Sequence, residues 1–456
     1  MEYTNIFYVL ASVLFILGIK KLSHPKTARH GNALAFIGML IAIAVTLLSY
    51  GELDFKIIAI GMIIGAMIGA TFAKKVEMTQ MPQMVAIFNG FGGGASALVA
   101  AAEFLKGGEI SSFTLGTIVL SIFVGTLTFS GSFIAFGKLQ GFISGQPIVF
   151  PGQKILNALM AISLIFIGMK VVQFPTEMNF FYAVIAISAI IGITLTIPIG
   201  GADMPVVISL LNSYSGVAAA ATGFVLMNNG LIIAGALVGA SGLILTNIMC
   251  KGMNRSLTNV IFGAVGLEQE SSGDGEAKQI SVKSYSTEEA AMIFDAADKV
   301  IVVPGYGLAV AQAQHAVREV AELLESKGKK VLYAIHPVAG RMPGHMNVLL
   351  AEANIPYEQL KDLDEINPEF EDCDVALVLG ANDVVNPAAR HDTSSPIYGM
   401  PILDVDKSRT VIINKRTMNT GFAGIQNELF GFDNSIMVFG DAKDMLQQLL
   451  KDLKEL

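Results

Sequence analysis

The 456-residue sequence is 53% hydrophobic and 15% charged, with a mean hydropathy of +0.59. This balance excludes an ordinary soluble globular protein and indicates a chain that is largely embedded in a membrane. A net charge of −8 gives no electrostatic basis for binding nucleic acid. The two cysteines, Cys250 and Cys373, provide neither a disulfide framework nor the spacing of a metal site.

The first 265 residues contain nine apolar segments. Their lengths suit membrane-spanning helices, which need roughly 20 residues to cross a bilayer. These segments are 6–19, 32–50, 57–73, 81–105, 113–136, 155–174, 180–199, 205–226 and 231–249. No basic region or cleavage pattern of a signal peptide precedes the first segment, so we expect it to remain as a membrane span. Residues 1–265 are therefore predicted to form a membrane bundle of about nine helices.

Basic residues are concentrated in alternate loops between these segments. One set of loops contains Lys20, Lys21, Lys26, Arg29, Lys74, Lys75, Lys138, Lys154, Lys251 and Arg255, whereas the opposite loops contain Lys56, Lys106 and Lys170. Because cytoplasmic loops carry an excess of lysine and arginine, we expect the N-terminus to lie outside the cell. With an odd number of spans, the rest of the chain is then cytoplasmic.

A few polar side chains lie within the predicted spans, where they are costly and often mark pathways for ions or protons. They include Asn89 in the fourth segment, Asp203, Asn212 and Ser213 in or beside the eighth, and Ser241 in the ninth. No histidine lies in any of the nine segments. For Asn212 two interpretations stay open, a hydrogen bond between helices and a role in proton passage.

Residues 266–286 are rich in serine, glycine and acidic residues and are predicted to be a linker. Residues 287–456 are predicted to form a Rossmann-like, doubly wound α/β domain, with Thr287 as the N-cap of a first helix at 288–298. We expect strands at 300–303, 330–335, 375–379, 401–405, 410–414 and 435–439, and a last helix at 442–453.

The first strand of this domain is followed by Pro304-Gly305-Tyr306-Gly307 and then by helical periodicity. A glycine-rich turn between a strand and a helix, with a second strand after it, is typical of a dinucleotide-binding site. In this pattern Gly305 permits a sharp turn, Gly307 lets backbone approach a phosphate, and Val310 takes the third, packing position. A purely structural turn is the alternative.

The residues after the second strand bear on the choice of dinucleotide. An NAD site normally places an acid there to bond the ribose 2′-hydroxyl, but this sequence has His336 and Arg341. The missing acid argues against NAD and leaves room for a 2′-phosphate, which needs basic partners elsewhere in the domain. Lys415 and Arg416 end a later strand and form a matched pair for a phosphate, although a basic pair at a strand end is also typical of a solvated surface. Asp383, in the loop 380–390, is expected to have a perturbed pKa near a diphosphate.

Long motifs run through the whole chain. They are ADMPVVISLLNSYSG at 202–216, MCKGMNRS at 249–256, VPGYGLAVAQAQ at 303–314, HPVAGRMPGHMNVLLAEA at 336–353, GANDVVNPAA at 380–389 and INKRTMNTGFAG at 413–424. In these motifs the sequence closely resembles the β subunit of the proton-translocating NAD(P) transhydrogenase family.

The resemblance implies that this chain supplies a membrane domain and an NADP(H) domain, while a partner α subunit holds NAD(H). Hydride would pass between the two nicotinamides, coupled to inward proton movement, in a dimer of αβ assemblies in the inner membrane. It also implies that NADP(H) is bound in reversed orientation, that Lys415 and Arg416 bind its 2′-phosphate, and that a loop around Gly421 covers it. No metal is implied.

Carried over residue by residue, the resemblance gives two sets of candidates and assigns Asp383 a modulating role without covalent chemistry. The cofactor-binding set is Gly305, Tyr306, Gly307, Val310, His336, Val338, Gly340, Arg341, Met342, Pro343, Gly380, Ala381, Asn382, Asp383, Lys415, Arg416, Gly421, Phe422 and Ala423. The proton-pathway set is Asn89, Asp203, Asn212, Ser213 and Ser241.

The sequence departs from the family pattern at two positions. Asn89 stands where members commonly have a histidine, and because asparagine cannot titrate, the proton carrier is expected on a partner helix. Phe422 stands where the covering loop commonly has tyrosine. A competing interpretation is a transporter or channel regulated by NADPH binding, which the match across the whole chain disfavours.

Overall fold

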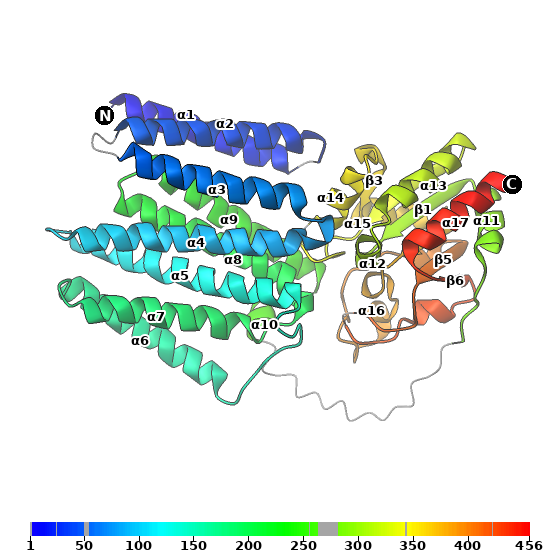
Figure 1. Ribbon diagram of the computed structural model, residues 1–456. Helices are drawn as coiled ribbons and strands as arrows, with labels where there is room; N and C mark the ends of the chain where they lie inside the picture. The colour runs from blue at the N-terminus through cyan, green and yellow to red at the C-terminus, as the bar shows by residue number, and fades with distance from the viewer. Residues whose placement is uncertain are drawn as a thin grey trace. The chain divides into compact units, whose positions relative to one another are not determined.

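The computed structural model describes residues 2–23, 25–49, 54–254, 256–262, 281–342, 344–421 and 423–456. The chain divides into two compact units, Met1–Asn247 with Leu257–Gly266 and Ile248–Ser256 with Leu267–Leu456. Figure 1 shows that the first unit is built of long helices and the second of a sheet flanked by helices.

Nine helices in the described part of the chain are long and apolar enough to cross a membrane, which confirms the predicted number. They are α1 (Glu2–Leu22), α2 (Pro25–Ser49), α3 (Phe55–Lys75), α4 (Met81–Lys106), α5 (Ser112–Gln140), α6 (Gln153–Gln173), α7 (Met178–Thr196), α8 (Met204–Val225) and α9 (Asn229–Gly252). A short helix, α10 (Leu257–Phe262), follows. The protein is thus a multi-pass membrane protein.

Small residues allow the central helices of this unit to approach closely. A Cβ added to Gly125 of α5 would lie 2.5 Å from the backbone oxygen of Gly93 in α4. A Cβ on Gly216 of α8 would lie 2.3 Å from the backbone nitrogen of Gly239 in α9. Close backbone contact of this kind is the usual source of helix association in lipid. Consequently α4 packs closely on α5, and α8 packs closely on α9.

The second unit contains a six-stranded, fully parallel sheet with the order β3-β2-β1-β4-β5-β6. Its strands are β1 (Lys299–Pro304), β2 (Lys330–Ile335), β3 (Leu360–Asp362), β4 (Val375–Leu379), β5 (Thr410–Lys415) and β6 (Ser435–Phe439). The order is that of the doubly wound dinucleotide-binding fold, with a switch in winding direction between β1 and β4. The predicted fold class is confirmed.

Helices cover both faces of this sheet, because parallel strands are buried on both sides. The helices of the unit are α11 (Thr287–Asp295), α12 (Tyr306–Val310), α13 (Gln314–Ser326), α14 (His345–Glu352), α15 (Leu363–Ile366), α16 (Ala388–His391) and α17 (Ala442–Glu455). α17 packs against α11 and α13 on one face. On the other, Phe370 and Phe430 belong to an apolar cluster with Ile301 and Ile413.

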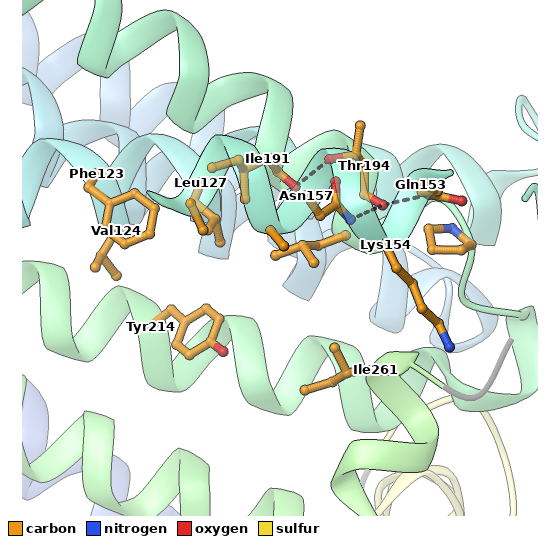
Figure 2. Close-up of a pocket in the computed structure, with 14 residues that line it drawn as sticks. Phe123, Val124, Leu127, Gln153, Lys154, Asn157, Ile191, Thr194, Tyr214 and Ile261 are labelled. Carbon is orange, nitrogen blue, oxygen red and sulfur yellow. Dashed lines mark hydrogen bonds between the residues drawn. The ribbon is translucent and has the colours of Figure 1, made fainter. Parts of the chain in front are cut away.

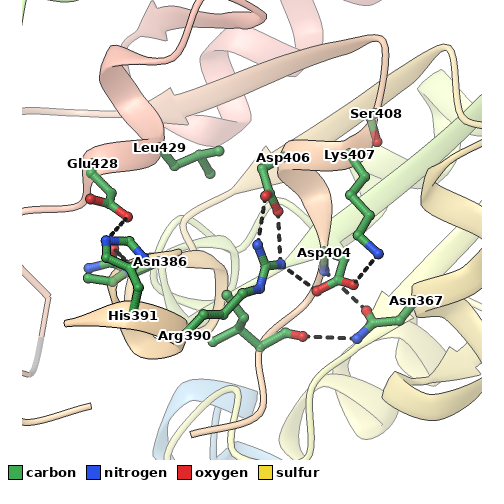
Figure 3. A network of polar contacts seen from close by, with 12 residues as sticks. Asn367, Asn386, Arg390, His391, Asp404, Asp406, Lys407, Ser408, Glu428 and Leu429 are labelled. Atoms are coloured by element: carbon green, nitrogen blue, oxygen red, sulfur yellow. Dashed lines mark hydrogen bonds and ion pairs between the residues drawn. The ribbon is translucent and has the colours of Figure 1, made fainter. Parts of the chain in front are cut away.

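The strand predicted at 401–405 is wrong. Ile402 and Leu403 are buried as a strand pattern requires, but their segment bonds to loops: Leu403 N–H donates to the Val384 oxygen at 2.9 Å. Asn367 accepts from the Asp404 N–H at 3.1 Å and donates to the Ile402 oxygen at 3.0 Å. Figure 3 shows how ion pairs from Arg390 to Asp404 and Asp406 fix the same segment. The sheet still has six strands, because the structure contains β3, a strand of three residues that the sequence did not predict.

Two local predictions also differ from the structure. Ser286, not Thr287, caps α11, in a capping box with Glu289 whose side chain accepts from the Ser286 N–H at 2.7 Å. The helix expected after the glycine turn is divided into α12 and α13, and Val310 is 41% exposed instead of packed. Within the predicted linker 266–286, Ser284 forms a parallel bridge to Met437 of β6, and residues 266–280 lie outside the described residues.

Candidate functional site

Two glycine-containing loops meet at the carboxyl ends of β1 and β4, where the sheet changes direction. The Gly305 N–H donates to the Leu379 oxygen at 2.9 Å, and the Gly307 N–H donates to the Gly380 oxygen at 3.0 Å. A Cβ on Gly305 would lie 2.4 Å from the Gly380 oxygen, and one on Gly307 would lie 2.6 Å from the Gly380 Cα. Gly305 has an extended backbone (φ −121°), so loop packing, not a sharp turn, requires glycine there.

A third loop, which follows β5, is held against the β4 loop by Asp383. Its Oδ2 accepts a hydrogen bond from the Ala423 N–H at 3.0 Å, and a Cβ on Gly421 would lie 2.5 Å from its Oδ1. The Asn427 side chain adds a bond to the Asn382 backbone oxygen at 2.9 Å. The structure thus brings together Asp383, Gly421 and Ala423, which the sequence predicted as one site from two separate motifs.

Lys415 lies at the end of β5, beside a cavity of about 400 Å³. The cavity is lined by Ser281, Asn382, Met418, Asn419, Thr420, Gln426, Asn427 and Phe430. The Lys415 ammonium donates to the Asn419 oxygen at 2.7 Å and lies 4.7 Å from the centre of the Phe430 ring. Burial lowers the pKa of Lys415, and the negative charge of Asp383 opposes this shift. Arg416, next along the chain, is exposed.

The residues around this cavity suit a phosphorylated nucleotide. A lysine, a neighbouring arginine and the amide side chains of Asn382 and Asn427 provide donors for phosphate and hydroxyl oxygens. Met418 and Phe430 provide apolar surface for a base or ribose. The sequence prediction missed Asn427 and Phe430, because they follow the recognised motif and only the folded loop returns them to Lys415.

The candidates after β2 surround Tyr306 and His336. The Arg341 guanidinium lies 4.4 Å from the centre of the Tyr306 ring, and burial raises the pKa of Tyr306 while Arg341 opposes the shift. His336 is 2% exposed: its Nε2 donates to the Pro401 oxygen at 2.7 Å and its Nδ1 accepts from the Val338 N–H at 3.2 Å. This neutral tautomer braces the loop, and burial lowers the pKa of His336 to about 4.

The remaining cofactor-binding candidates of the second unit differ in their surroundings. Gly340 has φ +109° and its missing side chain leaves room for His345. Met342 and Ala381 are buried. Pro343 and Phe422 lie outside the described residues.

In the membrane unit, Asn89 joins three helices. Its Nδ2 donates to the Ser132 hydroxyl of α5 at 3.1 Å, and its backbone oxygen accepts from the Ser215 hydroxyl of α8 at 3.1 Å. The prediction did not include Ser132 or Ser215, because a serine on a packed helix face gives no distinctive signal in sequence. The structure places a continuous polar contact between α4, α5 and α8 at this level.

The other proton-pathway candidates are dispersed. Ser213 is buried and donates to the Gly239 oxygen of α9 at 2.7 Å. Ser241 donates within α9, to the Val238 oxygen at 3.0 Å. Asp203 is 8% exposed just before α8, and Asn212 is half-buried on α8. No group of histidine, cysteine and acidic residues that could hold a metal occurs in the described part of the chain.

Fold and geometry together define a multi-pass membrane protein that carries a Rossmann-like domain, with glycine loops that meet at the switch point of its sheet. The family model for the NAD(P) transhydrogenase beta subunit matches residues 4–452. The NAD(P) transhydrogenase subunit beta of Rhodospirillum rubrum is 54% identical over 453 residues, which cover 97% of each chain, and the protein of that name from strain ATCC 11170 gives the same values. The chain belongs to the NAD(P) transhydrogenase beta-subunit family.

Proposed function

We propose that this chain transfers hydride between its own NADP(H) and NAD(H) held by a partner alpha subunit, and couples the transfer to proton movement across the membrane. The observation that carries the proposal is the β1–β4 switch point with its glycine loops and Lys415, within a chain 54% identical to a transhydrogenase beta subunit. Under this proposal the protein lies in the inner membrane with its N-terminus outside and its α/β unit in the cytoplasm. Two alpha–beta assemblies form a dimer.

The nicotinamides supply the hydride donor and acceptor, so no side chain has to act as a nucleophile. The chain contributes binding, orientation and the exclusion of water. Lys415 and Arg416 bind the 2′-phosphate, and Arg341 adds a further cation near the glycine loops. The loop of Gly421 and Ala423 covers the site, and Asp383 controls it because its carboxylate accepts the Ala423 N–H. A proton on that carboxylate oxygen would remove the acceptor and release the loop.

In the membrane unit, protons pass through water held by polar side chains of α4, α8 and α9, which include Asn89, Asn212, Ser213 and Ser241. Asp203 stands at the cytoplasmic mouth. Since Asn89 cannot titrate, a helix of the alpha subunit supplies the titrating relay group.

The first test is cofactor choice. A charge-assisted hydrogen bond contributes about 1.5–3 kcal/mol, so each cation should contribute roughly 10- to 150-fold in affinity for the 2′-phosphate. The full chain in detergent is titrated with NADP⁺ and NAD⁺ by calorimetry. We expect a strong preference for NADP⁺ that the Lys415→Ala, Arg416→Ala variant loses and the Lys443→Ala control keeps. Equal affinity of the unmodified chain for the two dinucleotides would contradict the assignment.

The second test is the division of labour. The purified chain should bind NADP(H) but transfer no hydride to an NAD⁺ analogue until the alpha subunit is added. Turnover by the chain alone would contradict the proposed two-subunit reaction.

A further inference from the structure

The membrane unit contains a cavity of about 730 Å³ that none of the proposed roles uses. It lies among α5, α6, α7, α8 and α10, and its volume is within the roughly 300–1,000 Å³ of sites that hold small molecules. Figure 1 shows that α6 and α7 diverge toward the end that carries the N-terminus of α6. Toward that end the cavity is lined by Gln153, Lys154 and Asn157 of α6 and by Thr194 and Leu195 of α7.

The two ends of the cavity differ in chemistry, as Figure 2 shows. Phe123, Val124 and Leu127 of α5 form an apolar end, to which Tyr214 of α8 presents its ring. Gln153, Lys154 and Asn157 of α6, with Thr194 of α7, form a polar end. An elongated amphiphile matches this distribution better than a soluble metabolite, which would leave its polar groups against the apolar end.

Three features of the polar end favour a negatively charged group. Lys154 is the one charged residue among the fourteen that line the cavity, and it is exposed. α6 begins here after Gly152, with no side-chain cap and no acidic residue in its first turn, so the positive end of its dipole is not neutralised. Lys154 lies in that first turn, at the end of the span that the proposed orientation places on the cytoplasmic side. Basic pockets between membrane helices on that side bind anionic headgroups.

Asn157 provides an acceptor beside these positive groups. Its Nδ2 is 3.5 Å from the Thr194 oxygen, to which Gln153 Nε2 already donates at 2.8 Å. The Asn157 Oδ1 is buried and has no hydrogen-bond partner among the described residues. A buried acceptor without a partner is costly, and a hydroxyl group placed in the cavity would satisfy it.

We propose that this cavity binds one phospholipid with an anionic, hydroxyl-bearing headgroup of the phosphatidylglycerol type. The phosphate lies between Lys154 and the N-terminus of α6, a headgroup hydroxyl donates to Asn157 Oδ1, and an acyl chain fills the end formed by Phe123, Val124 and Leu127. Because the chain reaches Tyr214, the lipid packs against α8, the helix that also carries Asn212.

The test uses the full chain assembled with its alpha subunit in nanodiscs that contain phosphatidylglycerol with a photoreactive diazirine in its acyl chain. Crosslinked peptides are identified by mass spectrometry. Ala158→Trp fills the cavity, whereas Leu159→Trp adds the same ring to an α6 residue that is 59% exposed and does not line it. We expect labelling of residues 123–127 to fall at least tenfold in Ala158→Trp and to persist in Leu159→Trp. Equal labelling in the two variants overturns the proposal.

The headgroup is tested with Lys154→Ala, an exposed substitution that leaves the packed interior unchanged and remains informative if Ala158→Trp does not assemble. Its matched control is Lys74→Ala, which removes a charge in the last turn of α3. Removal of Lys154 should reduce the preference for phosphatidylglycerol over phosphatidylcholine with identical chains about fivefold, and the control should not. Labelling that is equal for both lipids in the unmodified protein overturns the proposal. Absence of lipid labelling at residues 123–127 also overturns it and would mean that a protein segment occupies the cavity.

Discussion

The contact between the β1 and β4 loops depends on three glycines, of which Gly380 is the most constrained. Its φ is +65°, and an added Cβ would lie 2.4 Å from the Gly307 Cα. An alanine in the left-handed region costs roughly 1–2 kcal/mol, and overpacking against backbone adds about 1–3 kcal/mol. Gly380→Ala should therefore lower the free energy of unfolding of the α/β unit by the sum of both effects, measured by pulse proteolysis in urea.

Gly328 is the matched control for this substitution, because its φ is +84° and nothing lies within 4 Å of an added Cβ. Gly328→Ala should show the conformational cost without the steric one. If both variants lose the same stability, the close approach of the two loops does not contribute to the fold.

His336 makes the stability of the same unit depend on pH. Burial lowers its folded pKa to about 4 from an ordinary 6.5. The unfolded chain therefore binds more protons between these values, and stability is present above pH 6.5 and is lost as the pH falls toward 4. The shift corresponds to a loss of about 3 kcal/mol. The His336→Gln variant should show a flatter pH profile of unfolding in urea than the unmodified chain.

At the residue scale, sequence reasoning could find site residues that belong to one short motif, such as Gly305-Tyr306-Gly307 or Lys415-Arg416. It could not find Asn427 or Phe430, because their place beside Lys415 depends on how the loop after β5 folds back. It also gave Gly305 the wrong physical reason, since only the structure shows the Gly380 oxygen where a Cβ would be.

The loop after β5 is the element whose position depends most on a single side chain. Asp383→Ala removes the acceptor of the Ala423 N–H, a bond to a charged group that is worth about 1.5–3 kcal/mol. We expect the Ala423 amide to lose protection from hydrogen exchange and NADP(H) affinity to fall with it. Asp383→Asn retains an oxygen acceptor and should show a smaller change in both measurements. Unchanged exchange in Asp383→Ala would mean that other contacts hold the loop.

Helices and strands could be predicted from the sequence where a long run of apolar residues marked them. The buried runs of β1, β4 and β5 and the nine apolar helices fall in this class. β3 was missed because it has three residues, two of them the polar Lys361 and Asp362. The segment 401–405 has the burial of a strand, but its N–H groups bond to the β4 loop and to Asn367, and hydrophobicity cannot distinguish these partners from a neighbouring strand.

At the scale of the whole molecule, proton coupling is the property that the sequence predicts least directly. Asn89 is tied to Ser132 and Ser215, and Ser213 to Gly239, so these groups already have structural partners that pack helix on helix. Asn212, half-buried on the same helix as Ser213 and Ser215, is the strongest remaining candidate for holding water in the path. The two interpretations of Asn212, packing and proton passage, make opposite predictions for one substitution.

If Asn212 holds water in the proton path, Asn212→Leu should abolish proton-coupled turnover, because leucine interrupts the water chain. The NADP(H) affinity of the chain should stay unchanged, because the substitution leaves Gly305 and Lys415 intact. Proton uptake and hydride transfer are measured together in vesicles that contain the complete complex. Asn89→Leu should have a smaller effect, since the alpha subunit carries the titrating group and the lost Ser132 bond is worth only about 1 kcal/mol. Thr71→Ala, which removes a bond within α3 outside the proposed path, controls for helix stability. Full coupling in Asn212→Leu would exclude this route and assign Asn212 to packing.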